Sequence, residues 1–189
     1  MNTGLPLPER AQQLIKQHLS PGDYAIDATV GNGHDTVFLA QQLAPSGQVF
    51  GFDIQQQAID NTRSRLVEHN LETLVTLFQN SHARMVEHIP SNLHGHIKAT
   101  MFNLGYLPGS DKSIITRSDT TLAALETSIE LIAENGIITV LVYPGHAGGD
   151  TEALAINQWL PQQQSVSVKT YTSPVVTPHA PILHCLEKC

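Results

Sequence analysis

The 189-residue chain has few of the residues that mark several classes of protein. Its two cysteines, Cys185 and Cys189, both stand at the C-terminal end and form no CxxC pair, which argues against a disulfide framework and a zinc module. No apolar run approaches the ~20 residues of a membrane span, and the first residues do not form a basic stretch followed by an apolar one. We therefore expect a soluble, cytoplasmic protein.

Basic residues are also scarce. The 10 Lys and Arg are outnumbered by 17 Asp and Glu, which gives a net charge of -7 and argues against a broad basic groove for nucleic acid. The 10 His can still add local positive charge beside a phosphate, which would raise their pKa. With 41% hydrophobic residues and no repeat or linker-like stretch, residues 1–189 are expected to form one domain with a sizeable core.

Hydrophobic periodicity predicts that helices and strands alternate along the chain. The predicted helices cover 7–19, 34–43, 55–69, 81–89, 119–134 and 150–160. The predicted strands cover 24–27, 48–53, 74–78, 98–102, 137–142, 165–172 and 182–187. This order indicates an α/β fold with a Rossmann-like, doubly wound, mostly parallel sheet of seven strands. Because no helix separates the last two strands, they are expected to form an antiparallel hairpin at one edge.

A glycine turn, Gly31-Asn32-Gly33, follows the first predicted strand, which ends at Asp27. Asp53 ends the second strand 20 residues after Gly33, a spacing typical of a carboxylate that binds ribose hydroxyls. A dinucleotide fingerprint would have a third glycine where Thr36 stands, and a carboxylate at position 27 suits a cationic ligand better than a pyrophosphate. The pattern therefore favours S-adenosylmethionine over NAD. The competing interpretation is a βα turn that uses glycine for geometry alone.

Asn103 and Tyr106 form a second motif, directly after the fourth predicted strand. Asn103-Leu-Gly-Tyr106 has the spacing of the Asn-Pro-Pro-Tyr motif of amine methyltransferases. An Asn oxygen can accept the N–H of a neutral amine and leave the lone pair facing a methyl donor, while a Tyr can stack on a base or a cation. The alternative is an Asn that bridges a turn beside a core Tyr.

Further strings at 52–55, 80–82, 102–109 and 143–149 complete a resemblance that covers roughly residues 22–187. With them the chain resembles a family of small bacterial proteins labelled rRNA methylases, whose assigned activity is that of the tRNA 5-aminomethyl-2-thiouridine methyltransferase. The resemblance implies a class I S-adenosylmethionine-dependent fold, methyl transfer to the amino nitrogen at the tRNA wobble uridine, and a homodimer. Methylation of rRNA or of a small amine, and an NAD- or nucleotide-binding module, remain the alternatives.

The resemblance also assigns residues to the cofactor. It places the methionine part at Gly31, Asn32 and Gly33, the ribose at Asp53 and Gln55, and the adenine at Ser81 and His82. Asp27, His34 and Asp35 complete the expected cofactor-binding set. Ser81 could instead cap a helix, and His34 and Asp35 could simply form a solvated first turn.

On the substrate side, Asn103 and Tyr106 are the expected catalytic residues, with His146 as a candidate base that removes a proton from the amine. Lys112 and Arg117 are candidates for contacts with RNA phosphates. A structural His146 and solvated basic residues are the alternatives. His94 and His96 flank a glycine without a third ligand, so no metal site is expected.

Overall fold

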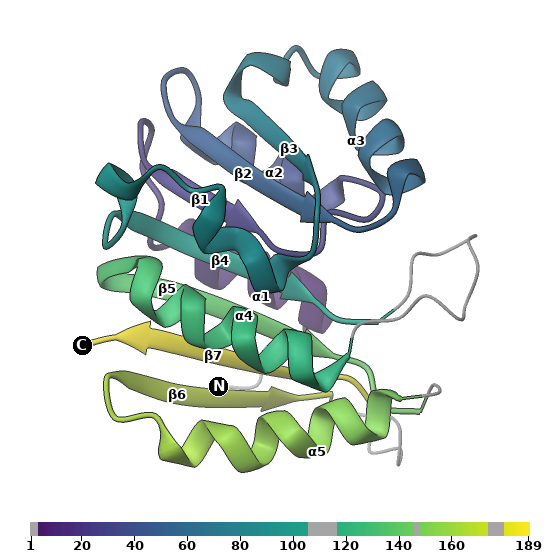
Figure 1. Cartoon of the computed structure of the whole chain (residues 1–189), viewed down its shortest axis with the longest axis vertical. Coiled ribbons are helices and arrows are strands. Elements are labelled where there is room, and N and C mark those ends of the chain that lie inside the picture. The colour runs from purple at the N-terminus through teal and green to yellow at the C-terminus, as the bar shows by residue number, and fades with distance from the viewer. Residues whose placement is uncertain (1–3, 106–116, 146–147, 174–179) are drawn as a thin grey trace.

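The structure is a computed structural model that describes residues 4–105, 117–145, 148–173 and 180–189. Seven strands form one sheet in the order β3-β2-β1-β4-β5-β7-β6 (Figure 1). Their bounds are β1 Tyr24–Asp27, β2 Gln48–Asp53, β3 Val75–Gln79, β4 Ile97–Asn103, β5 Ile132–Val142, β6 Val166–Thr172 and β7 Ile182–Lys188. Strands β1 to β5 pair in parallel, whereas β7 runs antiparallel to both β5 and β6. The predicted parallel sheet with an antiparallel edge pair is confirmed.

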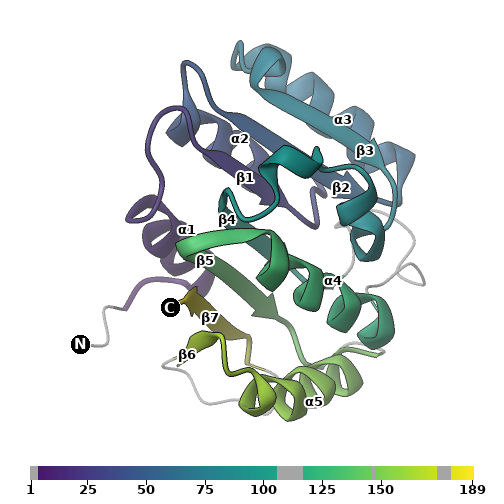
Figure 2. The same ribbon diagram turned by 60° about the vertical axis from the view of Figure 1, so that its left-hand side comes forward.

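Helices cover both faces of the sheet. Helices α1 Leu7–Lys16, α2 His34–Leu43 and α3 Gln56–Glu68 lie on one face, and α4 Ser118–Leu131 and α5 Gly149–Trp159 lie on the other (Figures 1 and 2). Side chains alternate along β5, so that Ile138 and Val140 belong to the core under α4 and α5, whereas Ile137 and Leu141 belong to the core under α1 and α2. Burial on both faces explains why residues 137–142 of this strand are apolar except for Thr139.

Several predicted boundaries differ from the structure. The helix expected over 119–134 ends at Leu131, because the backbone of Ile132 is extended and pairs with Ile97 of β4. Lys188 Nζ donates to the carbonyls of Ile129 and Ile132, both at 3.0 Å, and so caps the helix end. The chain then turns through Asn135 at a φ of 58° before regular pairing with β4 resumes at Ile137. The helix expected over 81–89 is a 3₁₀ segment, His82–Glu87, and further 3₁₀ turns occupy Glu72–Leu74, Ser91–Leu93 and Leu160–Gln162.

The carboxyl ends of β1 to β5 meet at one edge of the sheet. From β1 the chain builds outward through β2 and β3, then returns to β4 on the other side of β1. Open α/β sheets bind their ligands beside this reversal of strand order. None of the helices in the described ranges has the length and hydropathy needed to cross a bilayer.

Candidate functional site

A cavity of about 790 Å³ opens at this edge of the sheet. The loops that follow β1, β2, β3, β4 and β5 line it, together with the start of α4. Of the residues expected at the site, the described lining contains Gly31, Asn32, His34, Asp35, Asp53, Gln55, Ser81, His82, Asn103 and Arg117. The structure therefore brings the cofactor motif and the amine motif into one cavity.

The glycine loop is held from the side by α3. Gly33 is the N-cap of α2 with a φ of 79°, and a Cβ at this position would lie 2.7 Å from Thr62 Oγ1. Thr62 Oγ1 also donates to the Gly31 carbonyl at 3.2 Å, and Arg65 Nε donates to the Asn32 carbonyl at 2.9 Å. Only glycine combines this backbone angle with so close an approach of α3. Gly33 thus shapes the loop from behind, outside the cavity lining.

Asp53 fixes the opposite side of the same loop. Its Oδ2 accepts the Gly31 amide and its Oδ1 accepts the Gln55 amide, both at 2.9 Å. Each carboxylate oxygen retains a second lone pair that can accept from a ligand hydroxyl. Beside it, Phe52 lines the cavity and Ile54 leaves 54% of its surface exposed, which gives this end of the cavity an apolar wall. A flat base attached to a ribose fits this combination.

Ser81 and His82 lie at the start of the 3₁₀ segment after β3. Ser81 Oγ accepts the Ala83 amide at 3.2 Å, so Ser81 caps this turn and lines the cavity at once. His82 is buried, and burial lowers its pKa because it penalises the charged imidazolium. Its Nδ1 lies 3.1 Å from the Ala28 carbonyl, whereas its Nε2 has no hydrogen-bond partner among the described residues. A neutral His82 therefore keeps one acceptor nitrogen unused.

Asp27 lies beneath the loop, outside the cavity lining, although it was expected to bind the cofactor. Its Oδ2 accepts the Thr36 hydroxyl at 2.6 Å and its Oδ1 accepts the Thr29 amide at 3.2 Å. Burial, reinforced by the negative charge of Asp35, raises the pKa of Asp27 to about 7. Asp27 therefore braces the loop and responds to charge in the cavity.

Asn103 ends β4 with an exposed side chain that lines the cavity. Its backbone amide donates to Thr29 Oγ1 at 2.7 Å, which ties the end of β4 to the loop after β1. Its Nδ2 lies 3.5 Å from Asp35 Oδ2, and Gln12 Nε2 donates to Asp35 Oδ1 at 2.8 Å. Tyr143 lines the same region, and its pKa is raised by burial and by the charge of Asp35. Asp35 therefore faces Asn103, and the alternative of a solvated first turn does not describe it.

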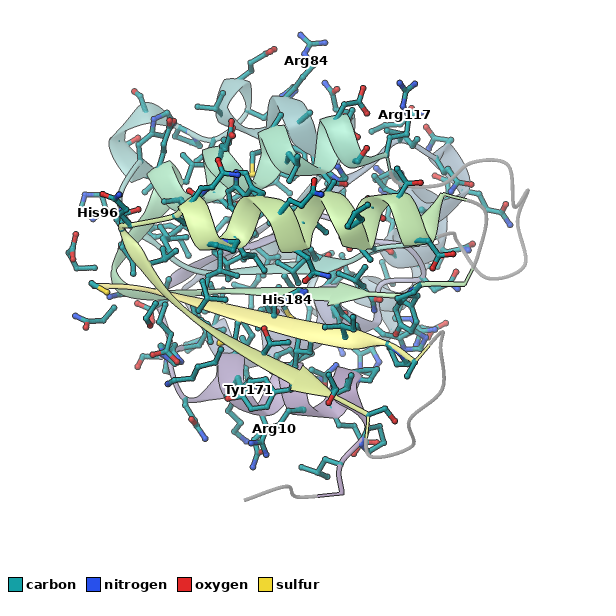
Figure 3. All side chains as sticks on the ribbon, turned by 90° about the horizontal axis from the view of Figure 1, so that it is seen from below. Arg10, Arg84, His96, Arg117, Tyr171 and His184 are labelled. Atoms are coloured by element: carbon teal, nitrogen blue, oxygen red, sulfur yellow. The ribbon has the colours of Figure 1, made fainter. Side chains whose placement is uncertain are left out.

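The charges of the lining favour a cationic ligand. Asp35 and Asp53 are its acidic residues, and Arg117 is the single Lys or Arg in the described part of the lining. Arg117 sits at the rim with most of its side chain exposed and pairs with Asp119 at 3.2 Å (Figure 3). Tyr106, Lys112 and His146 lie outside the described residues. A pyrophosphate would meet two carboxylates here, which argues against a dinucleotide.

The sequence does not predict a role in the site for three residues, Gln12, Thr29 and Tyr143. Gln12 comes from α1, 23 residues before its partner Asp35, and no local pattern signals that contact. Thr29 stands inside the cofactor motif, but its bond to the Asn103 amide depends on the pairing of β1 with β4.

Comparison with known proteins gives a family match over most of the chain. The family model described as "Putative rRNA methylase" matches residues 49–187. A curated relative, the chloroplastic tRNA (mnm(5)s(2)U34)-methyltransferase of Arabidopsis thaliana, is 41% identical over 152 residues, which are 76% of this chain and 55% of the relative. A demethylmenaquinone methyltransferase of Lactobacillus johnsonii is 29% identical over 60% of this chain and 47% of its own length. The chain thus spans about half the length of these two curated relatives.

Two solved structures match along the whole fold. A "putative rRNA-methylase" from Clostridium thermocellum is 40% identical with a TM-score of 0.94, over 99% of this chain and 100% of that one. A "putative methyltransferase" from Streptococcus mutans, solved in complex with SAH, is 34% identical with a TM-score of 0.86, over 98% of this chain and 99% of that one.

Proposed function

The chain belongs to the rRNA methylase family, and we propose that it is an S-adenosylmethionine-dependent methyltransferase that acts on the amino nitrogen of 5-aminomethyl-2-thiouridine at the tRNA wobble position. The observation that carries the proposal is that Asn103 faces the same cavity as the loop held by Asp53. The name of the relative from Arabidopsis thaliana supports the choice of this uridine.

The residues of the cavity fit the cofactor. Asp53 and Gln55 stand where they can bind ribose hydroxyls, and Phe52 and Ile54 provide an apolar wall for adenine beside Ser81 and His82. Gly31 and Asn32 also line the cavity, which supports their assignment to the methionine part. When bound, S-adenosylmethionine supplies a methyl group on a positively charged sulfur. The structure of the Streptococcus mutans relative, solved with SAH, supports this choice of ligand.

The task of the protein in such a reaction is to aim a nitrogen lone pair. The Asn103 Oδ1 can accept an N–H of the amine, which turns the lone pair toward the methyl donor. An aminomethyl group is mostly protonated at neutral pH, so one proton must leave before the lone pair is available. Desolvation in the cavity and a neighbouring cation both favour that loss. His146 and Tyr106 keep their proposed roles as base and stacking residue.

We further propose that tRNA is the macromolecular partner and that the protein works as a cytoplasmic homodimer. Arg117 at the cavity rim, with Lys112, is the proposed contact to RNA phosphates. A net charge of -7 gives little long-range attraction for RNA, so we expect binding to depend on these local contacts.

The direct test uses tRNA whose wobble uridine carries the 5-aminomethyl group without its terminal methyl. Incubation with methyl-labelled S-adenosylmethionine should place label in that nucleoside alone, and fully modified tRNA should take up none. Label in rRNA, or in a small amine with affinity that is insensitive to salt, would replace the proposed substrate by one of the alternatives.

The cofactor is tested separately by thermal unfolding. S-adenosylhomocysteine should raise the melting temperature through mass action, and NAD should not. The reverse result would favour an NAD-binding module and would contradict the proposed function.

A further inference from the structure

Gln12, Asp35 and Asn103 form a line of polar side chains from α1 to the end of β4. Gln12 Nε2 donates to Asp35 Oδ1 at 2.8 Å, and Asn103 Nδ2 lies 3.5 Å from Asp35 Oδ2. A carboxylate can only accept hydrogen bonds, so its neighbours must present their N–H groups to it. The Asn103 Nδ2 is thereby assigned to Asp35, and the Asn103 Oδ1 is left for the substrate.

Asp35 retains capacity for a ligand. An ionised carboxylate offers about four acceptor positions, and described residues occupy two of them. The ion pairs found in the described part of the chain join other residues, namely Arg63–Asp60, Arg84–Glu87, Arg117–Asp119 and Lys169–Glu187. Asp35 is partly buried and lines the cavity next to Tyr143, where solvent screening is weaker than at the surface. A cationic group that enters this end of the cavity would therefore find a carboxylate in place.

We infer that Asp35 binds the protonated amine of the substrate beside Asn103, and that Gln12 is a positioning residue that fixes the Asp35 carboxylate. The inference rests on the proposed function, because it requires an amine as the acceptor of the methyl group. It transfers Asp35 from the cofactor to the substrate. Asp35 captures the ammonium form, one proton then passes to the proposed base, His146, and Asn103 Oδ1 accepts an N–H of the neutral amine.

The ammonium of the cofactor's methionine part is the other cation that could meet Asp35. The position of Asp35 favours the substrate, since its cavity-facing contact is with Asn103 at the end of β4. The two sources can be separated because cofactor affinity and amine recognition are measured independently.

The experiment compares two anticodon stem-loops on protein saturated with S-adenosylhomocysteine. One carries 5-aminomethyl-2-thiouridine at the wobble position, and the other carries 2-thiouridine. A hydrogen bond to a charged group is worth about 1.5–3 kcal/mol, so the wild type should prefer the amine by roughly 10- to 100-fold. Asp35→Asn should reduce this preference to less than about threefold, since the amide lacks the negative charge, and Gln12→Leu should reduce it partly.

Two control variants come from α1, the helix that carries Gln12. Gln13→Leu makes the same change at the adjacent, solvent-exposed position, and Glu9→Gln neutralises an exposed carboxylate of α1. Both should keep the wild-type preference, and all four variants should bind S-adenosylhomocysteine with wild-type affinity. A folding defect is measured separately, as a lowered melting temperature of the variant without ligand, so that a loss of affinity for S-adenosylhomocysteine at unchanged melting temperature reports on the cofactor site.

The outcomes distinguish failure of the inference from failure of the proposed function. If the wild type methylates the amine and prefers it, but Asp35→Asn retains that preference, the inference is wrong and the proposed function stands. If Asp35→Asn loses cofactor affinity and keeps the preference, Asp35 belongs to the cofactor and the inference is again wrong. If the wild type neither methylates nor prefers the amine, both are overturned.

Discussion

The ends of β2 and β4 both place a polar side chain in the cavity, but the two side chains are used differently. At the end of β2, both oxygens of Asp53 accept backbone amides at 2.9 Å, so the carboxylate is part of the loop it stabilises. At the end of β4, the Asn103 side chain is exposed, and its one side-chain hydrogen bond to a described residue is long, 3.5 Å to Asp35. The backbone beneath Asn103 is nevertheless fixed, by the bond of its amide to Thr29.

This contrast indicates a division of labour. A loop held on one side by Asp53 and on the other by α3 keeps its shape without a ligand, as a site for a resident cofactor requires. An amide with unused acceptor capacity on a fixed backbone suits a reacting group that arrives and leaves. Changes at the end of β4 should therefore reduce turnover, and changes at the end of β2 should reduce cofactor affinity.

The largest effect is expected from Asn103→Ala. Loss of a positioned hydrogen-bonding group typically lowers turnover about 10²- to 10³-fold, so kcat with the amine-bearing tRNA should fall by this factor. Cofactor affinity, measured by calorimetry, should change by less than about twofold because the contact is to the amine.

Asn92→Ala is the matched control, because Asn92 is an exposed asparagine of the 3₁₀ turn Ser91–Leu93, away from the cavity lining. It should behave as the wild type. Equal losses of turnover and cofactor affinity in the Asn103 variant would remove the distinction between the two strand ends.

Asp53→Ala should produce the complementary result. It removes a charged acceptor from the ribose position and leaves the Gly31 and Gln55 amides without their partner. We expect S-adenosylmethionine to bind about 10- to 100-fold more weakly, with kcat at saturation much less affected.

Asp60→Ala removes an exposed carboxylate of the neighbouring helix α3 and should leave the affinity unchanged. If Asp53→Ala instead lowers kcat at saturating cofactor as strongly as Asn103→Ala, the end of β2 takes part in the chemistry, and the division of labour between the two strand ends is wrong.

How far the sequence predicts this site depends on the range of the contacts involved. Asp53 and Asn103 could be found because Asp53 ends one predicted strand and Asn103 follows another, and parallel strands bring their carboxyl ends together. The alternating pattern also predicts the antiparallel β6–β7 pair, since no helix separates these strands.

Contacts between distant elements could not be predicted in the same way. The end of α4 is capped by Lys188, which is 56 residues away from Ile132, and Asp35 is held by Gln12 of another helix. Asp27 has the right residue type for a cationic ligand, but only the fold reveals that Thr36 and Thr29 occupy its oxygens beneath the loop. Such side-chain directions follow from packing, which a one-dimensional pattern does not contain.

The stiffness of the cofactor loop can be tested with a pair of glycines that share a backbone angle. Gly33 and Gly95 have φ values of 79° and 77°, but a Cβ at Gly33 would meet Thr62 at 2.7 Å whereas a Cβ at Gly95 has nothing within 4 Å. An alanine in the left-handed region costs about 1–2 kcal/mol of unfolding free energy. Gly95→Ala should lose only this amount of unfolding free energy. Gly33→Ala should lose about 1–3 kcal/mol more, because its methyl group would overlap Thr62.

Chemical denaturation measures both losses, and calorimetry should show weaker cofactor binding for Gly33→Ala alone. Equal losses of stability in the two variants would mean that the glycine loop can shift away from α3. The loop held by Asp53 would then be less rigid than the comparison of the two strand ends requires.

The smallest expected effect concerns Asp27 and pH. Its pKa of about 7 means that the buried carboxyl is largely protonated at pH 6 and largely ionised at pH 8. A cationic cofactor above the loop favours the ionised form and lowers this pKa, so binding releases a proton and affinity rises as the pH increases through 7. An attraction of about 1 kcal/mol corresponds to a roughly fivefold gain in S-adenosylmethionine affinity between pH 6 and 8.

Two controls test this assignment. Asp27→Asn cannot ionise, so its affinity for S-adenosylmethionine should not change with pH. S-adenosylhomocysteine has a neutral sulfur, so its affinity for the wild-type protein should depend less on pH. If the affinity of Asp27→Asn still rises with pH, another group releases the proton. The ionisation of Asp27 beneath the loop would then be independent of the charge of the cofactor.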